Sequence, residues 1–324
     1  MSLPALLEER LRLPLVAAPM FLVSNPALVA ACCSSGVVGS FPALNQRESS
    51  GFRDWLQEID HHLSGAHKPA PYAVNLIVHH SNPRLQADLS ICVEQRVPIV
   101  ITSLGAVKEV VDAVHSYGGL VFHDVTTRRH AEKAADAGVD GLIAVAAGAG
   151  GHAGTWSPFV LVAEIRQFFD KTLLLSGCLN HGHEILAAQL LGADLAYMGT
   201  RFIATRESQA SDEYKQMLLQ AHAADIIHTA AVSGVPASFL RQSLQQAGYD
   251  EERLKNKGEM NYAEKLKPVS GEAKAWKTVW SAGQGVGEIR DLPTSEELIA
   301  RLDREYRAAH NHAAQLSHRW LRQP

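Results

Sequence analysis

Apolar and polar positions along this chain alternate in blocks rather than residue by residue. Eight short runs are apolar almost throughout, which is typical of strands buried on both faces of a parallel sheet. These runs cover residues 13–20, 37–42, 72–78, 98–103, 119–125, 141–147, 172–177 and 195–200. Amphipathic segments of helical length lie between them, so the pattern predicts alternating strands and helices through the first two thirds of the chain.

The segments between the runs carry helix start and stop signals. Asn25 followed by Pro26 is typical of a helix N-terminus. Gly138 and Gly192 stand where a helix C-terminus commonly places glycine. Strand–helix alternation repeated eight times favours a closed (β/α)8 barrel, a TIM barrel in the α/β class, over a doubly wound sheet. Such barrels carry their chemistry at the C-terminal ends of the strands, so we look for site residues there.

Residues 208–275 do not continue the pattern. This stretch is charge-rich in its second half and shows no strand-like run. We expect a mainly helical insertion after strand eight that packs over the barrel mouth and covers the substrate. The barrel domain would then comprise residues 1–207 and 276–324. Residues 295–321 are expected to form one long helix whose apolar face suits a homodimer.

Composition and charge exclude several classes of protein. The 324 residues are 46% hydrophobic and carry a net charge of −4, and no Lys/Arg cluster with interleaved aromatics suggests a nucleic-acid partner. No apolar run approaches the ~20 residues that span a bilayer, and the N-terminus does not resemble a secretory signal. The four cysteines form no C-x-x-C pair. We therefore expect a cytoplasmic protein with reduced thiols and no membrane partner.

Histidine spacing gives no metal site. His61–His62 and His79–His80 are adjacent pairs whose side chains point apart on regular structure. The chain has no H-E-x-x-H or similar spacing, so we predict that catalysis uses no metal.

The loops after the seventh and eighth strands are candidates for a phosphate site. Barrels commonly bind phosphate there through exposed backbone N–H groups. Gly177 and Gly199 would let the main chain approach the ligand, and Ser176 and Thr200 add hydroxyl donors. Tight turns alone would also explain the glycines. Cys178 is interpreted as a packing residue rather than a nucleophile.

Residues 145–158, "VAAGAGGHAGTWSP", place four glycines around His152. An imidazole that projects from a glycine-rich loop at a barrel mouth suits a general base or a hydrogen-bond donor. Gly148, Gly150 and Ala153 also fit a G-x-G-x-x-A dinucleotide fingerprint. That fingerprint requires an early βα turn and an acidic residue at the end of the next strand. Here the loop follows the sixth strand, and the next strand ends without an acid, so the dinucleotide interpretation fails.

With these residues in place, the chain resembles the nitronate monooxygenase family, which are FMN-dependent barrels. The motifs that carry the resemblance are "AAPM" (17–20), "VNL" (74–76), "AGGHAG" (149–154), "SGC" (176–178), "GADLAYMGTRFIATRES" (192–208) and "SAGQGVG" (281–287). The resemblance spans essentially the whole chain. It implies an oxidoreductase that oxidises alkyl nitronates, such as propionate 3-nitronate, with O2 to a carbonyl compound and nitrite.

The resemblance also implies a role for each candidate residue. Ser176, Gly177, Gly199 and Thr200 would hold the FMN phosphate, and Met20, Asn75, Gly150 and Gly151 would line the flavin. His152 would stand over the reactive face of the ring, as a base toward neutral nitroalkanes or as a group that orients a nitronate anion.

Asp124 departs from the family pattern, because several relatives carry a lysine at this cofactor-binding position. A cation there would stabilise anionic reduced flavin, and a carboxylate would not. Either Asp124 turns away from the flavin, or another group such as Arg128 supplies the charge. Two alternative functions stay open: an NAD(P)H-dependent FMN oxidoreductase acting on a quinone or an enoyl thioester such as enoyl-ACP, and a flavin-binding protein without catalysis.

Overall fold

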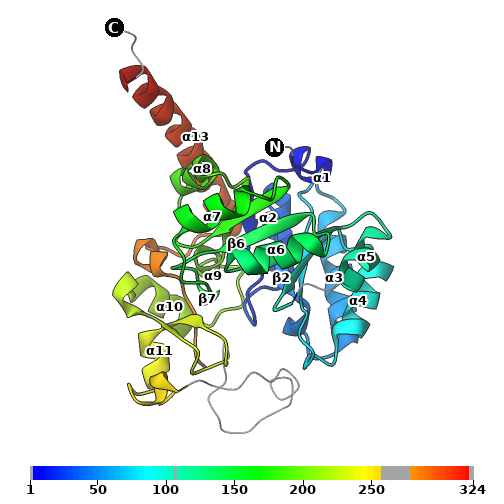
Figure 1. Ribbon diagram of the computed structural model, residues 1–324, viewed down its shortest axis with the longest axis horizontal. Coiled ribbons are helices and arrows are strands. Elements are labelled where there is room, and N and C mark those ends of the chain that lie inside the picture. Colours follow the sequence, from blue (N-terminus) through cyan, green and yellow to red (C-terminus); the bar gives the residue numbers. More distant parts are fainter. Residues whose placement is uncertain (1–2, 106–107, 257–277, 321–324) are drawn as a thin grey trace.

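The computed structural model describes residues 3–105, 108–256 and 278–320 (Figure 1). Its main sheet has eight strands: β1 (Leu15–Ala17), β2 (Ser40–Pro42), β3 (Ala73–Ile77), β4 (Ile99–Ser103), β5 (Leu120–Val125), β6 (Gly141–Val145), β8 (Thr172–Ser176) and β9 (Leu195–Met198). Neighbouring strands pair in parallel in the order β1-β9-β8-β6-β5-β4-β3-β2. A parallel bridge between Val16 and Val38 joins the two ends of this order. The predicted (β/α)8 barrel is therefore confirmed.

The structure describes the following helices, most of which cover the outside of the strands. They are α1 (Ala5–Glu8), α2 (Pro26–Ser34), α3 (Ser49–Leu63), α4 (Leu85–Glu94), α5 (Lys108–His115), α6 (Arg128–Asp136), α7 (Pro158–Arg166), α8 (Gly182–Leu191), α9 (Thr200–Ile203), α10 (Asp212–Gln220), α11 (Arg241–Gln246) and α13 (Ser295–Trp320). The Asn25 side chain caps α2 by accepting the Leu28 N–H at 2.8 Å. Gly192 ends α8 in the left-handed conformation at φ 112°, as the sequence predicts.

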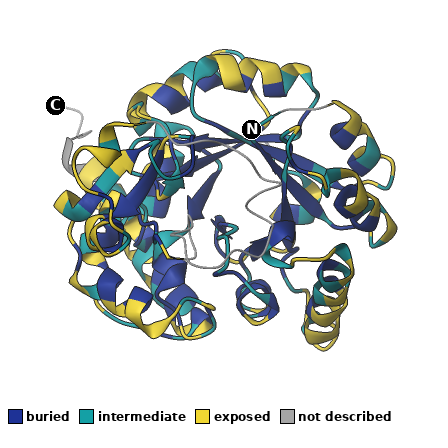
Figure 2. Cartoon of the chain, turned by 90° about the horizontal axis from the view of Figure 1, so that it is seen from below, coloured by how far each residue is buried: buried dark blue, intermediate teal, exposed yellow. Residues whose placement is uncertain are grey.

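Two apolar layers hold the barrel together, because alternate residues of each strand face inward and outward. The inner layer includes Ala73, Ile101, Phe122, Ile143 and Leu174, and all are buried. The outer layer, between the strands and the helices, includes Val74, Val100, Val121, Leu142 and Leu173. Figure 2 shows the result: the strands are buried, and the helices around them are exposed on their outer faces.

The long helix α13 closes the barrel wall. It packs against α8, where the Tyr306 hydroxyl donates to Gln189 Oε1 at 2.6 Å and Glu305 accepts the Gly182 N–H at 2.8 Å. A Cβ on Gly182 would lie 2.1 Å from the Leu302 carbonyl oxygen, so glycine is required where the two helices meet. The far end of α13 projects beyond the barrel (Figure 1). In the part of the chain that the structure describes, no helix has both the length and the apolar character that a bilayer crossing needs.

A second, smaller sheet was not predicted. It contains β10 (Ile226–Thr229), β11 (Ala237–Leu240) and β7 (Gly151–His152), paired antiparallel in the order β10-β11-β7. The expectation of no strand in 208–275 is wrong for β10 and β11. Each has only four residues, and β11 pairs with a two-residue strand far away in the sequence, so no apolar run marked them. Residues 257–275 of the expected insertion lie outside the described residues.

Short 3-10 helices complete the connections: η1 (Ala43–Asn45), η2 (Ala223–Asp225), η3 (Arg253–Lys255) and η4 (Gln284–Glu288). In Figure 1, α10 and α11 lie at the lower left, on the side of the molecule where β7 is labelled. The pairing of β7 with β11 ties the segment after β9 to the loop after β6.

Candidate functional site

Three polar side chains line the inside of the barrel at the C-terminal ends of β3, β4 and β5. Asn75, Ser103 and Asp124 each follow a buried apolar residue two positions earlier on the same strand face. Asn75 Nδ2 donates to the Ile101 carbonyl at 3.2 Å and to Ser103 Oγ at 2.7 Å. Ser103 Oγ in turn donates to Asp124 Oδ2 at 2.5 Å. A continuous hydrogen-bonded chain therefore runs across three neighbouring strands and ends on Asp124.

Only one of the two oxygens of the Asp124 carboxyl group accepts a hydrogen bond from a described residue. Its Oδ1 is buried and has no hydrogen-bond partner among the described residues. Burial raises the pKa of Asp124 to about 6, although the hydrogen bond from Ser103 lowers it. The alternative cation, Arg128, is engaged elsewhere: it pairs with Glu132 at 2.8 Å and donates to Gln167 at 2.6 Å.

The glycine-rich loop after β6 packs directly on the loop at 281–285. Gly151 N–H donates to Ser281 Oγ at 2.8 Å, and Gln284 N–H donates to the Gly148 carbonyl at 2.8 Å. A Cβ on Gly150 would lie 2.8 Å from Gly283 N, so the close approach that Gly150 permits is to protein backbone. Gly151 takes the left-handed conformation at φ 67°, and a Cβ there would make only an ordinary van der Waals contact, 3.8 Å from Ser281 Oγ.

His152 lies where the barrel loop meets the small sheet. Its backbone pairs with Ala237 of β11. Its ring Nε2 is 3.5 Å from Ser233 Oγ, and the one hydrogen of the Ser233 hydroxyl is donated to the Val235 carbonyl at 2.9 Å. Ser233 is fully buried. The histidine is thus held from one side by the barrel and from the other by the segment between β10 and β11.

The loops after β8 and β9, which are predicted to bind phosphate, both contact a third loop at residues 283–285. Ser176 is buried at the end of β8, and Gly177 follows at φ 130°. Thr200 Oγ1 accepts the Gly283 N–H at 2.9 Å, and Gly199 precedes α9. A Cβ on Gly285 would lie 3.3 Å from Cys178 Cα. The glycines of 283–285 therefore join the loops after β8 and β9.

Met20 borders this junction from the end of β1. Its N–H donates to Ser24 Oγ at 3.0 Å, and its carbonyl accepts from Asn45 Nδ2 at 3.2 Å. A Cβ on Gly199 would make ordinary van der Waals contacts, 3.7 Å from Ala18 Cβ and 4.0 Å from Met20 Sδ, so Met20 lies beside this glycine. Cys178 takes the left-handed conformation at φ 56°, with its sulfur 3.7 Å from the Gly148 carbonyl oxygen, and unlike the other three cysteines it is exposed.

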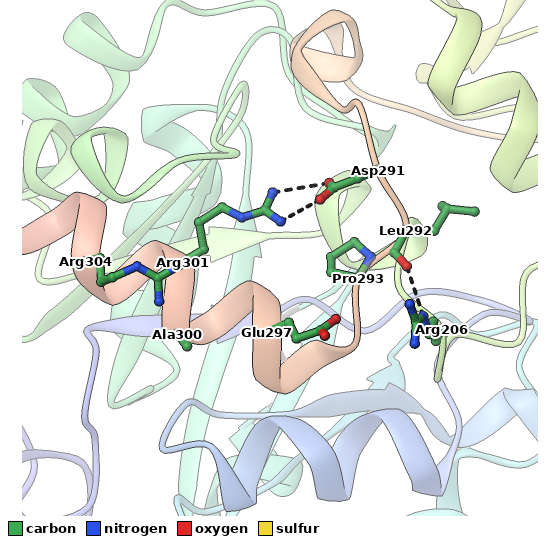
Figure 3. Close-up of a pocket in the computed structure, with 8 residues that line it drawn as sticks. All are labelled: Arg206, Asp291, Leu292, Pro293, Glu297, Ala300, Arg301 and Arg304. Atoms are coloured by element: carbon green, nitrogen blue, oxygen red, sulfur yellow. Dashed lines mark hydrogen bonds and ion pairs between the residues drawn. The ribbon is translucent and has the colours of Figure 1, made fainter.

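A separate cavity of about 580 Å³ lies on the outside of the barrel (Figure 3). Its lining is Arg206, Asp291, Leu292, Pro293, Glu297, Ala300, Arg301 and Arg304. Figure 3 shows the Arg301 guanidinium paired with Asp291, at 2.5 Å. None of these eight residues is a candidate site residue, so the cavity is distinct from the site at the strand ends.

Known proteins resemble this chain over most of its length. A sequence model of the family described as nitronate monooxygenase matches residues 54–305. The chain belongs to the nitronate monooxygenase family. A nitronate monooxygenase from Paraburkholderia phytofirmans is 28% identical over 344 residues, covering 90% of this chain and 92% of that protein. As a member of this family, the chain is an oxidoreductase enzyme.

Solved structures agree with the family on fold. Nitroalkane oxidase from Streptomyces ansochromogenes has a TM-score of 0.80 at 25% identity, over 95% of this chain and 100% of that one. FabK from Thermotoga maritima has a TM-score of 0.80 at 24% identity, over 96% of this chain and 97% of that one. The second likeness supports the shared barrel fold alone.

Some residues of the site in this family member escaped the sequence analysis. Ser103 and Ser233 were not predicted as site residues, and Ser281 and Gly283 appeared only within the "SAGQGVG" motif, without a role. The "SAGQGVG" stretch offered a signal, because it is as glycine-rich as the loop at 148–151. Ser233 offered none, since its place beside His152 depends on the pairing of β7 with β11.

The contact between the two glycine-rich loops gives a first prediction. A Cβ on Gly283 would lie 2.6 Å from the Gly148 carbonyl oxygen and 3.0 Å from Gly150 N. Gly283→Ala should therefore force the loops apart and lower the free energy of unfolding by about 1–3 kcal/mol in denaturant titrations. Gly287→Ala is the matched control, because its Cβ would meet no atom closer than 3.6 Å. Equal stability losses in the two variants would contradict the packing described here.

Proposed function

We propose that this enzyme uses FMN to oxidise alkyl nitronates, such as propionate 3-nitronate, with O2, and releases a carbonyl compound and nitrite. The observation that carries the proposal is the position of His152, held at the barrel mouth between the glycine-rich loop and β11. Membership of the nitronate monooxygenase family supports the same reaction class.

The strand-end residues fit a bound FMN. Gly177, Gly199 and Thr200 lie in loops that meet at the barrel mouth, where backbone N–H groups suit a phosphate. A Cβ on Gly151 or on Gly199 would meet no atom closer than 3.7 Å, and the buried Asp124 Oδ1 has no partner among the described residues, so Met20 and Gly151 would lie against the ring. When bound, FMN would supply the redox chemistry, since no protein side chain accepts electrons from a nitronate. Ser176 and Asn75 complete the proposed set of cofactor-binding residues with Gly150.

His152 would handle the proton and the charge of the substrate. Imidazole is the side chain best suited to move a proton near neutral pH, so His152 would remove the proton next to the nitro group of a neutral nitroalkane. A nitronate has already lost that proton. Toward the anion, the same ring would donate a hydrogen bond and fix its orientation.

The segment from α10 to α11 would cover the substrate. It carries β10 and β11, and β11 pairs with the strand that holds His152. Tyr214 on α10 stacks on Trp280 with ring centroids 5.0 Å apart, and its hydroxyl donates to the Ser281 carbonyl. The segment is therefore anchored to both loops that flank the proposed substrate space.

Ser233 should position His152 rather than take part in the chemistry. The contact between Ser233 and His152 is long, at 3.5 Å, so its loss is worth less than about 1 kcal/mol, and Ser233→Ala should lower kcat/KM for a neutral nitroalkane about two- to threefold. Ser233→Thr, which keeps the hydroxyl, should recover much of that loss. If the alanine variant kept the full kcat/KM while folding normally, Ser233 would have no positioning role.

Oxygen uptake and nitrite release test the proposed function together. Purified protein carrying FMN should consume O2 and release nitrite when it is given propionate 3-nitronate in air. Heat-denatured protein and free FMN are the controls for background oxidation. If the folded protein produced neither signal above these controls, the proposed reaction would be wrong.

A further inference from the structure

The hydrogen-bonded chain that ends on Asp124 has a fixed direction. The amide of Asn75 spends both hydrogens, one on the Ile101 carbonyl and one on Ser103 Oγ. Ser103 has one hydrogen, and it goes to Asp124 Oδ2. Oδ2 is therefore an acceptor in this chain, and any proton bound by the carboxyl group belongs on Oδ1.

The free oxygen of Asp124 lies in surroundings that disfavour a negative charge. Oδ1 is buried without a partner among the described residues. On β6, the inward residues beside it are Ile143 and Val145, and both are apolar and buried. Tyr197 on β9 lies close enough for the carboxyl charge to raise its pKa, and burial, the larger cause, raises that pKa as well, so Tyr197 stays neutral. Carboxyl groups buried among apolar and neutral side chains commonly keep their proton up to near-neutral pH.

The other ionisable groups near β5 lie on its outer side. The ring of His123, the preceding residue, is within 2.7 Å of Thr102 Oγ1, and its pKa is lowered to about 4 by burial and by His130. Arg128 on α6 is paired with Glu132. No cation among the described residues reaches Asp124 to hold it as a carboxylate.

We propose that Asp124 takes up a proton when FMN binds and donates a hydrogen bond from Oδ1 to the flavin ring. This inference rests on the FMN site proposed above. A neutral acid would serve the reduced flavin as a donor, whereas a carboxylate would repel its negative charge. Asp124 would then donate a hydrogen bond to the flavin, as the lysine that relatives carry at this position would, but as a neutral acid rather than a cation.

Proton uptake makes FMN affinity depend on pH in a defined direction. In the free protein, the pKa of Asp124 is raised to about 6. Below that pH the proton is already present, so affinity is flat. Above it each binding event must take a proton from solution, and the Kd for FMN should rise by up to about tenfold per pH unit.

The experiment dilutes the holoenzyme at a series of pH values and measures the fluorescence of released FMN. Asp124→Asn is the matched variant, because its amide donates at the Oδ1 position without titrating. The FMN phosphate also titrates near pH 6, but it contributes equally to both proteins and cancels in the comparison. The wild-type Kd should rise above pH 6 more steeply than the variant Kd, by up to about tenfold per unit.

Ser103→Ala is a second variant that keeps the carboxyl group. Ser103 lowers the pKa of Asp124, so its removal should move the onset of the rise in Kd to higher pH. Parallel profiles for wild type and Asp124→Asn, or an unmoved onset in Ser103→Ala, would overturn the proposal and assign Asp124 a role as an acceptor. A purified protein that holds no FMN at all would instead overturn the proposed function.

Discussion

Replacing His152 with glutamine is expected to lower kcat/KM for a neutral nitroalkane by about 10²–10⁴-fold, the usual contribution of a general base. Glutamine keeps hydrogen-bonding capacity and approximate size, but it cannot accept the substrate proton. The loss should be much smaller with a preformed nitronate, because that substrate needs no deprotonation. Steady-state oxygen consumption with both substrates measures the two effects in one preparation.

The comparison between substrates separates the two roles of His152. Equal losses on nitroalkane and nitronate would mean that the ring only orients the anion. Unchanged turnover on both would mean that His152 is not catalytic. His130→Gln is a suitable control, because His130 lies exposed on α6 and hydrogen-bonds only Thr126 and Thr127 in the contacts described.

Replacing Asp291 with alanine is expected to cost about 1.5–3 kcal/mol of the free energy of unfolding, because the mostly buried Arg201 guanidinium loses its carboxylate partner and keeps only backbone carbonyl acceptors. Arg201 follows Thr200 in the proposed phosphate loop, and its side chain is only 4% exposed. Its guanidinium donates to Asp291 Oδ1 at 2.7 Å, and Arg301 pairs with the other carboxylate oxygen. Urea unfolding followed by circular dichroism gives the loss.

Asp303→Ala is the control for this prediction. Asp303 also pairs with two arginines, Arg12 and Arg307, but their side chains are 51% and 70% exposed. Water can solvate both guanidinium groups after the change, so the loss should be near 1 kcal/mol. Similar losses at Asp291 and Asp303 would show that the burial of Arg201 does not decide the cost.

The stabilisation that the ion pairs of Asp291 provide should depend on pH in a defined direction. The hydrogen bond from Arg301 is the largest of the causes that hold the pKa of Asp291 below its ordinary value. A lowered carboxyl pKa stabilises the folded state above the ordinary aspartate range, and this contribution is lost as the pH falls through the lowered pKa. The difference in stability between wild type and Asp291→Ala should therefore shrink in acid.

The barrel was predictable because its signal is local and repeated. Each of the eight strands is a continuous apolar run, and parallel strands buried on both faces need such runs. Neighbouring strands in the sequence are neighbours in space, so Asn75, Ser103 and Asp124 could be expected at one edge. The register that lets Ser103 Oγ reach Asp124 could not be, since it depends on the pairing of β4 with β5.

The small sheet and the contacts between loops could not be predicted from the sequence, for a different reason. β7 has two residues, and its partner β11 lies more than eighty positions away, so neither carries a periodic pattern of useful length. The sequence suggested that Gly150 lets a flavin ring approach the backbone, whereas in the structure it lets the backbone of Gly283 approach. A glycine in a sequence marks a close approach, but only the structure shows what approaches.

Anaerobic mixing of the yellow holoenzyme with candidate reductants shows which of them reduces the flavin. We expect propionate 3-nitronate to bleach the flavin absorbance within the turnover time, and NADH and NADPH to leave it unchanged over the same period. Admission of O2 should then restore the oxidised spectrum with release of nitrite. Rapid bleaching by NADH or NADPH with none by the nitronate would contradict the account and identify a reductase.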